Sequence, residues 1–327
     1  MGLHFTAANV LIQSQQATED DVTTFVPQGM GWLPDLPDAR DYTFRHPQVL
    51  ELLRALQAAP DASSADQVDL RCDCEGEYFN EPRNQGSLNS STAFAVLSLV
   101  EYFERRLHGR TFEGSARFLY KVTRNILQKR ACLGEPFHDA HSSAWQLESD
   151  TGSDIRTALK VLTRFGVPPE DYWPYDITRF DEEPTAFHYA LAKPFSNLRY
   201  FRLDEPNISG EATWATVKSF LAAGFPIVFG FSVPTSMTSL TDIPYRPYHD
   251  GVRGGIAAIT TGYRINHYGP RRNALLIRTS WGSQCGDNGS AWLPAVFLRD
   301  QLARDFWTVI SADWLDSQEL TRPSVVD

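Results

Sequence analysis

The sequence is poor in cysteine, with only four in 327 residues, at positions 72, 74, 132 and 285. None of their spacings matches a paired zinc-ligand motif, and Cys72 lies too close to Cys74 for easy bridging. We therefore expect reduced thiols rather than a disulfide framework, and no cysteine-based metal site.

Long apolar runs and dense blocks of basic residues are also missing. No stretch is long enough to span a bilayer, and residues 1–27 lack the basic region, apolar core and small-residue cleavage site of a signal peptide. The formal net charge of −10 argues against nucleic acid or an anionic membrane as the main partner. These absences predict a cytoplasmic protein without a membrane span.

The most informative stretch runs from Arg83 to Glu104, where a loop rich in Gly, Asn and Ser leads into apolar residues at helical spacing. The small polar residues then lie at a helix N-terminus. Unpaired N–H groups and the helix dipole favour negative charge there, whether a thiolate, an oxyanion or a bound carboxylate. An N-capped core helix is the plainer interpretation of the same composition.

Two segments have distinctive residue sequences. Residues 85–95 read Gln-Gly-Ser-Leu-Asn-Ser-Ser-Thr-Ala-Phe-Ala, and residues 31–42 read Gly-Trp-Leu-Pro-Asp-Leu-Pro-Asp-Ala-Arg-Asp-Tyr. The first resembles the nucleophile loop of papain-like cysteine peptidases of the bacterial type and places Ser91 where the nucleophilic cysteine stands. The second resembles the lead-in of many bacterial members. Since its prolines fix an extended backbone, we expect a strap laid over the body of the protein.

The resemblance implies an α+β, papain-like fold, in which a helical half-domain packs against an antiparallel β-sheet or barrel half-domain with a cleft between them. Local patterns agree with that order. We expect helices at residues 46–56, from near Ser91 to 104, and at 118–127, 152–162 and 211–224, and strands at 68–71, 199–203, 226–233, 256–263 and 274–279. Secreted relatives often carry several disulfides, so the scarcity of cysteine fits an intracellular chain.

The chain divides into three parts on this interpretation. Residues 1–27 form an N-terminal segment, residues 28–65 the strap with a short helix and a linker, and residues 66–327 the papain-like body. The helical half of the body covers about 75–190 and the β half about 191–318.

The resemblance also indicates where the family's catalytic residues would stand. The Gly-Gly-His-Ala block of the family aligns with residues 254–257, and its Arg-Asn-Ser-Trp-Gly block with residues 278–282. Ile256 therefore replaces the catalytic histidine and Thr279 the orienting asparagine, while the oxyanion-hole glutamine is retained as Gln85. Isoleucine cannot take up a proton, and the hydroxyl of Ser91 depends on an adjacent base. We expect no catalytic residue in this chain.

These replacements predict a natural pseudopeptidase that binds a peptide, a protein segment or a small ligand through the former substrate cleft, as a scaffold, chaperone or regulator. No cofactor and no metal are expected, and the oligomeric state stays open. The residues that we expect to line the cleft are Gln85, Asn89, Ser90, Ser91, Gly254, Gly255, Ile256, Thr279 and Trp281.

An enzyme with reassigned chemistry is the alternative, with Ser91 and Gln85 acting beside a nearby residue. The neighbours in sequence are His249, His267 and Cys285, each more readily interpreted as a surface or structural residue.

The segment from Lys129 to Asp150 is longer than the family pattern and contains His138, Asp139 and His141. Two histidines and one carboxylate on a loop supply no fixed metal geometry, so we interpret the segment as a solvated insertion. Insertions beside a cleft are also where partner recognition accumulates.

Overall fold

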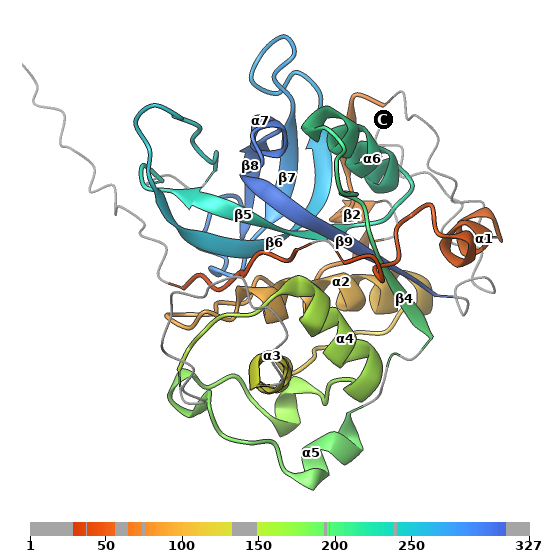
Figure 1. The fold of residues 1–327 in the computed structure, drawn as a ribbon, viewed down its shortest axis with the longest axis vertical. Helices are drawn as coiled ribbons and strands as arrows, with labels where there is room; N and C mark the ends of the chain where they lie inside the picture. Colours follow the sequence, from red (N-terminus) through yellow and green to blue (C-terminus); the bar gives the residue numbers. More distant parts are fainter. Residues whose placement is uncertain are drawn as a thin grey trace, which may run out of the picture.

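The chain forms a helical half followed by a sheet half, in the order that the sequence predicts. These features come from a computed structural model, which describes residues 29–36, 38–55, 65–73, 76–132, 149–192, 195, 197–237 and 241–311. The papain-like α+β architecture is therefore confirmed. Figure 1 shows the sheet above and most helices below, with the red-orange strap between them.

The helical half is built around one buried helix, α2 (Ser91–His108). It packs against α3 (Ala116–Cys132), α4 (Ile155–Phe165) and the longest strand of the sheet. Leu97, Leu99 and Tyr102 of α2 are fully buried, because apolar residues surround the helix on most sides. The short helix α5 (Ala186–Leu191) and the 3₁₀ turns η1 (Glu170–Tyr172) and η2 (Ile177–Arg179) complete this half.

The helix ends follow the chemistry of their residues. Gly109 ends α2 in the left-handed conformation with φ 60° and donates its N–H to the carbonyl of Arg105. Asp154 caps α4, because its carboxylate accepts the N–H of Thr157 at 2.6 Å.

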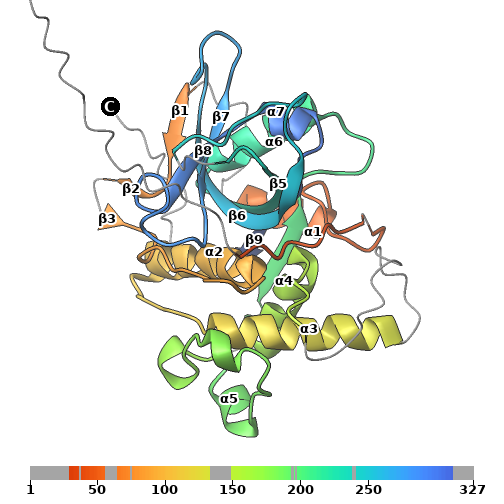
Figure 2. The same cartoon turned by 90° about the vertical axis from the view of Figure 1, so that its left-hand side faces the viewer.

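The sheet half is an antiparallel sheet of seven strands, which curves strongly in Figure 2. Its order is β4-β9-β5-β6-β7-β8, with β1 paired to the end of β6. The strands are β1 (Gln67–Asp69), β4 (Leu198–Arg202), β5 (Ile227–Pro234), β6 (Val252–Arg264), β7 (Ala274–Arg278), β8 (Ser290–Pro294) and β9 (Ala303–Ser311).

Three further helices and a small hairpin surround the sheet. Helix α1 (Pro47–Ala55) contacts β9, α6 (Gly210–Ala222) contacts β6 and α7, and α7 (Val296–Arg299) contacts β9. The hairpin consists of β2 (Cys72–Asp73) and β3 (Gly76–Glu77).

The expected helices and strands are present, with ends displaced by a few residues. The expected antiparallel pair is β6 and β7, with Ile259 opposite Arg278. Within the described ranges, Cys72 and Cys285 are free thiols, and no described helix is both long and apolar enough to cross a membrane. Residues 1–27, most of the 56–65 linker and residues 133–148 of the insertion lie outside the described residues.

Candidate functional site

Ser91 is the first residue of α2 and is fully buried. Its Oγ accepts a hydrogen bond of 3.1 Å from the backbone N–H of Ala257 on β6. Ala257 directly follows Ile256, the residue at the position of the family's histidine. The N-terminus of α2 therefore meets β6 beside that position. The structure thus brings the two aligned positions, Ser91 and Ile256, to the same junction.

The chemistry of this junction is apolar on the sheet side. Ile256 is fully buried and offers no group that exchanges a proton. In the described part of the chain, no imidazole or amine is hydrogen-bonded to Ser91. A serine hydroxyl without an adjacent base is a poor nucleophile.

Thr279 follows β7 directly, and its hydroxyl is directed at a thiol. Thr279 Oγ1 donates to Cys285 Sγ at 3.5 Å, and both side chains are buried. Burial raises the pKa of Cys285, which the hydrogen bond from Thr279 opposes only in part. The pair is therefore a neutral packing contact, with the thiol protonated at neutral pH.

Gln85 is held in one orientation by Ser280. The backbone N–H of Gln85 donates to the Ser280 carbonyl at 2.8 Å, and the Ser280 hydroxyl donates to Gln85 Oε1. Because Oε1 is occupied, the amide nitrogen of Gln85 points the other way, where it donates to the carbonyl of Met30 at 2.9 Å.

The Met30 carbonyl lies where two donors converge. It accepts from Gln85 Nε2 and, at 3.4 Å, from the backbone N–H of Ser91. A side-chain amide and a helix N-terminal N–H that converge on one oxygen resemble the two donors of an oxyanion hole, with the contact from Ser91 the longer of the two. In this protein a carbonyl of the chain itself occupies that position.

Residues 29–33 are bonded to both halves of the protein. On the sheet side, the N–H groups of Gly31 and Trp32 donate to the carbonyl of Gly255 at 2.9 and 3.0 Å. On the helical side, Ser153 donates its N–H to Gly31 at 2.8 Å and accepts the N–H of Leu33 at 3.1 Å. This part of the strap therefore lies between the two halves and is bonded to both, and Figure 1 shows the strap in that position.

Side chains around the first two residues of this segment add to the contact. Trp281 Nε1 donates to the carbonyl of Gly29 at 3.0 Å, and the N–H of Met30 donates to Asn89 Oδ1 at 3.2 Å. At Gly254, an added Cβ would lie 3.0 Å from the Met30 side chain. Five of the expected cleft residues, Gln85, Asn89, Ser91, Gly255 and Trp281, therefore hydrogen-bond to the strap.

Ser90 takes no part in holding the strap or in capping α2. Its hydroxyl is hydrogen-bonded to the Tyr175 hydroxyl at 2.6 Å, and Tyr175 also donates to the carbonyl of Gln85 at 2.8 Å. Burial raises the pKa of Tyr175. With no capping side chain at Ser90, the strap carbonyl itself serves one of the first N–H groups of α2.

Glycines allow the strap to approach this closely. Gly31 has φ +121°, and a Cβ there would lie 1.9 Å from the carbonyl oxygen of Asn89. The indole of Trp32 lies on Gly230 and Gly255, where an added Cβ would come within 1.9 and 2.8 Å of the ring. Any larger residue at these positions would displace the strap.

A buried charge cluster fixes the strap beyond Trp32. Asp305 accepts the indole N–H of Trp32 at 3.0 Å and the backbone N–H of Asp35 at 2.8 Å, while its other oxygen accepts from Arg202. Arg156 of α4 pairs with Asp35 at 3.0 Å and with Asp41 at 2.6 Å. No sequence motif indicates this cluster, because its members are scattered along the chain.

Burial dominates the acidities in this cluster. It raises the pKa of Asp305 to about 6, and Arg202 offsets the effect only in part. Burial and the neighbouring carboxylates Asp154 and Asp305 also raise the pKa of Asp35 well above its usual value. The strap is therefore held by carboxylates that bind protons more readily when folded than when unfolded.

The two histidines considered for a reassigned reaction lie elsewhere. His267 is 3.6 Å from Asp242 and stacks on Trp292 at 4.2 Å. Backbone contacts place His249 in a turn, with its N–H on the Arg246 carbonyl. Within the described residues no group of three or more His, Cys, Asp or Glu could hold a metal, and His138, Asp139 and His141 lie outside those residues.

Comparison with known proteins agrees with this geometry. No model of a known protein family matches the chain. It is 27% identical over 314 residues to an uncharacterised peptidase C1-like protein of Acanthamoeba polyphaga mimivirus, covering 93% of this chain and 91% of that protein.

Solved structures show the same fold. Xylellain, a cysteine protease from Xylella fastidiosa, is 26% identical with a TM-score of 0.64, over 87% of this chain and 97% of xylellain. A digestive procathepsin L2 proteinase of Tenebrio molitor is 16% identical with a TM-score of 0.59, over 90% of this chain and 81% of that chain. The fold is thus papain-like, and these relatives support kinship with papain-like cysteine peptidases.

Replacing Trp32 tests how strongly the strap is held. Trp32→Ala should lower the free energy of unfolding by about 3–5 kcal/mol, because it empties the space over Gly230 and Gly255. Trp32→Phe is the matched control, which keeps a ring there and removes the hydrogen bond to Asp305 at a cost of about 1–2 kcal/mol. Urea unfolding measures both. A loss below that of the control would contradict a tightly packed strap.

The charge cluster predicts a pH dependence. The pKa of Asp305 is about 6 in the folded protein, above its ordinary value of 3.8. The folded state therefore keeps this proton at pH values where the unfolded chain has lost it, and this carboxyl favours folding below about pH 6. Stability from this group should fall as the pH rises through about 6. Asp305→Asn should flatten the profile between about pH 4 and 6, the interval between the ordinary and the folded pKa of this carboxyl, as measured by denaturant unfolding at each pH. Asp171→Asn, at an exposed position on the helical half, should leave the slope unchanged.

Proposed function

We propose that this chain is a non-hydrolytic, papain-like protein whose former substrate cleft holds a peptide segment, and that it acts as a scaffold or regulator in the cytoplasm. One observation carries the proposal. The carbonyl of Met30 is bound by Gln85 and by the N–H of Ser91, the two donors that resemble an oxyanion hole. The cleft thus retains its hold on a peptide while the groups that would cleave it are replaced.

The missing groups explain why the bound segment persists. Nucleophile, base and orienting residue act as a unit, and losing them together removes about a million-fold in rate. An oxyanion hole alone supplies only ~10³ to 10⁴ over water. With Ser91, Ile256 and Thr279 at these positions, the Met30–Gly31 peptide bond meets donors but no nucleophile and base pair.

A tethered segment is a strong competitor for its own cleft. Because residues 29–33 are part of the same chain, their effective concentration at the site is in about the millimolar range or above. A peptide, a protein segment or a small ligand from outside must displace them before it binds. This supports a regulated scaffold, in which the partner and the strap compete for one surface.

The alternative of a reassigned enzyme has less support. Gln85 and Ser91, the two polar groups it would use, are both hydrogen-bonded to backbone atoms. His249 and His267 make their contacts elsewhere.

The first test is hydrolysis. Wild-type protein and the Ser91→Ala variant should show the same background rate on fluorogenic peptides, since neither has a base at position 256. Ser91→Cys with Ile256→His should stay silent as well, because residues 29–33 occupy the cleft and Thr279 leaves the new ring unoriented. Peptide cleavage that disappears in Ser91→Ala would refute the proposal.

The second test is binding in trans. A labelled peptide with the sequence of residues 29–36 should bind the Trp32→Ala variant, in which the strap is loosened, and not the wild-type protein. Fluorescence anisotropy measures this, with a scrambled peptide as control and circular dichroism to check the fold of the variant. Equal binding to both proteins would show that the strap does not occupy the peptide site.

A further inference from the structure

A cavity with a volume of about 600 Å³ lies on the sheet half, away from the strap. Helices α6 and α7, the segment around Asp242 and the loop between β6 and β7 surround it. This volume lies in the range of about 300–1,000 Å³ that is typical of small-molecule sites. None of its lining residues takes part in the strap contacts, so it is a separate feature.

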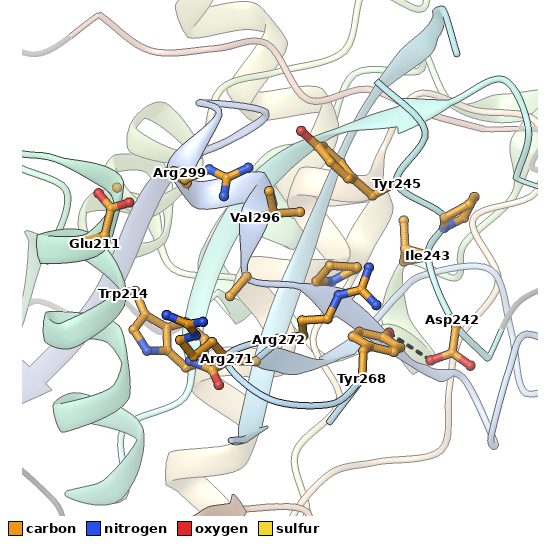
Figure 3. A pocket seen from close by; sticks show the side chains of 15 residues that line it. Glu211, Trp214, Asp242, Ile243, Tyr245, Tyr268, Arg271, Arg272, Val296 and Arg299 are labelled. Atoms are coloured by element: carbon orange, nitrogen blue, oxygen red, sulfur yellow. Dashed lines mark hydrogen bonds between the residues drawn. The ribbon is translucent and has the colours of Figure 1, made fainter. Parts of the chain in front are cut away.

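Three arginines line this cavity in a chain whose formal net charge is −10. Arg271 and Arg272 come from the β6–β7 loop, and Arg299 ends α7. Figure 3 draws Arg271 toward Trp214, Arg272 toward Tyr268, and Arg299 across the cavity. Among the described residues, Arg299 pairs with Asp300 at 2.8 Å, whereas the guanidinium groups of Arg271 and Arg272 have no carboxylate partner.

The loop that carries the two arginines is held by its own hydrogen bonds. Arg271 has φ 60° and donates its N–H to Asn266 Oδ1 at 2.6 Å, and the N–H of Arg272 donates to the Gly269 carbonyl at 3.0 Å. The N–H of Tyr268 donates to the carbonyl of Arg272 at 3.0 Å. These bonds fix where both arginine side chains leave the backbone.

The acidic groups of the cavity do not cancel this charge. Asp242 Oδ1 accepts the Tyr268 hydroxyl at 2.8 Å and lies 3.6 Å from His267 Nε2, so this oxygen is engaged by those partners. Glu211 stands on the first turn of α6 and is exposed. Two arginines without carboxylate partners at the rim of one cavity favour an anion, since guanidinium matches carboxylate and phosphate.

Flat and apolar side chains form the rest of the wall. The rings of Trp214, Tyr245 and Tyr268 and the side chains of Ile243 and Val296 all line the cavity. Trp214 is supported by an edge contact with Tyr263, with the two ring centroids 6.1 Å apart. A surface of this kind covers a planar apolar body.

We propose that this cavity binds a small organic anion, in which a carboxylate or phosphate group is joined to a planar apolar body. Arg271 and Arg272 hold the anionic group, and the wall around Trp214 covers the body. The proposal is independent of the function assigned to the strap cleft, because the two sites share no residue.

Titration calorimetry on the full-length protein tests the proposal with phenyl phosphate and benzoate as probes. At least one should bind, and Arg271→Gln with Arg272→Gln should weaken that binding about tenfold or more. Arg110→Gln is the matched control, because Arg110 is exposed after α2 on the helical half, and it should leave binding unchanged. Thermal unfolding of the double variant checks that it folds.

The two probes distinguish a phosphate site from a carboxylate site, and either result supports the proposal. Inorganic phosphate and phenol test the two parts of the ligand, and each should bind about tenfold or more weakly than the joined probe. Absence of binding by both aromatic anions at millimolar concentration would overturn the proposal. So would binding that survives the double variant, or inorganic phosphate binding as tightly as phenyl phosphate.

Discussion

The carbonyl of Met30, shared between the N–H of Ser91 and the amide of Gln85, is the contact on which the rest of the arrangement depends. It satisfies an N–H at the start of α2 that no capping side chain serves, because the hydroxyl of Ser90 is bonded to Tyr175. It also fixes the strap at the point where the helical half meets β6. One backbone oxygen therefore joins the strap to the central helix and to Gln85, which Ser280 holds from the sheet half.

The strap is stabilised by two contributions of different kind. The indole of Trp32 is buried over Gly230 and Gly255, which supplies packing and burial of apolar area. Beyond it, Asp35 and Asp305 are buried beside Arg156 and Arg202, where desolvation works against the Coulombic attraction. The packing of Trp32 provides most of the stabilisation of the strap, and the hydrogen bonds of the charged groups fix its position along the interface.

The proposed replacement of the triad and the two donors Gln85 and Ser91 are consistent with one another in this arrangement. Once position 256 holds an isoleucine, the junction of α2 and β6 is better suited to packing than to proton transfer, and a peptide carbonyl can occupy the donors permanently. The sheet half carries a separate cavity lined by Arg271 and Arg272, which pair with no carboxylate among the described residues. The two proposed sites therefore differ in chemistry, one suited to a peptide backbone and one to an anion.

The sequence by itself determined the local elements, and it carries the resemblance from which the replacement of the triad is proposed. Helical spacing after Ser90, the cap Asp154 and the strands around 226–233 and 256–263 are set by neighbours in the chain, and the resemblance placed Ser91, Ile256 and Thr279. Strand β9 was missed because its buried run has no alternation. Only the tertiary structure showed what fills the cleft. The bond from Gln85 to Met30 spans 55 positions and that from Trp32 to Asp305 spans 273, and no local pattern reports which distant groups folding brings together.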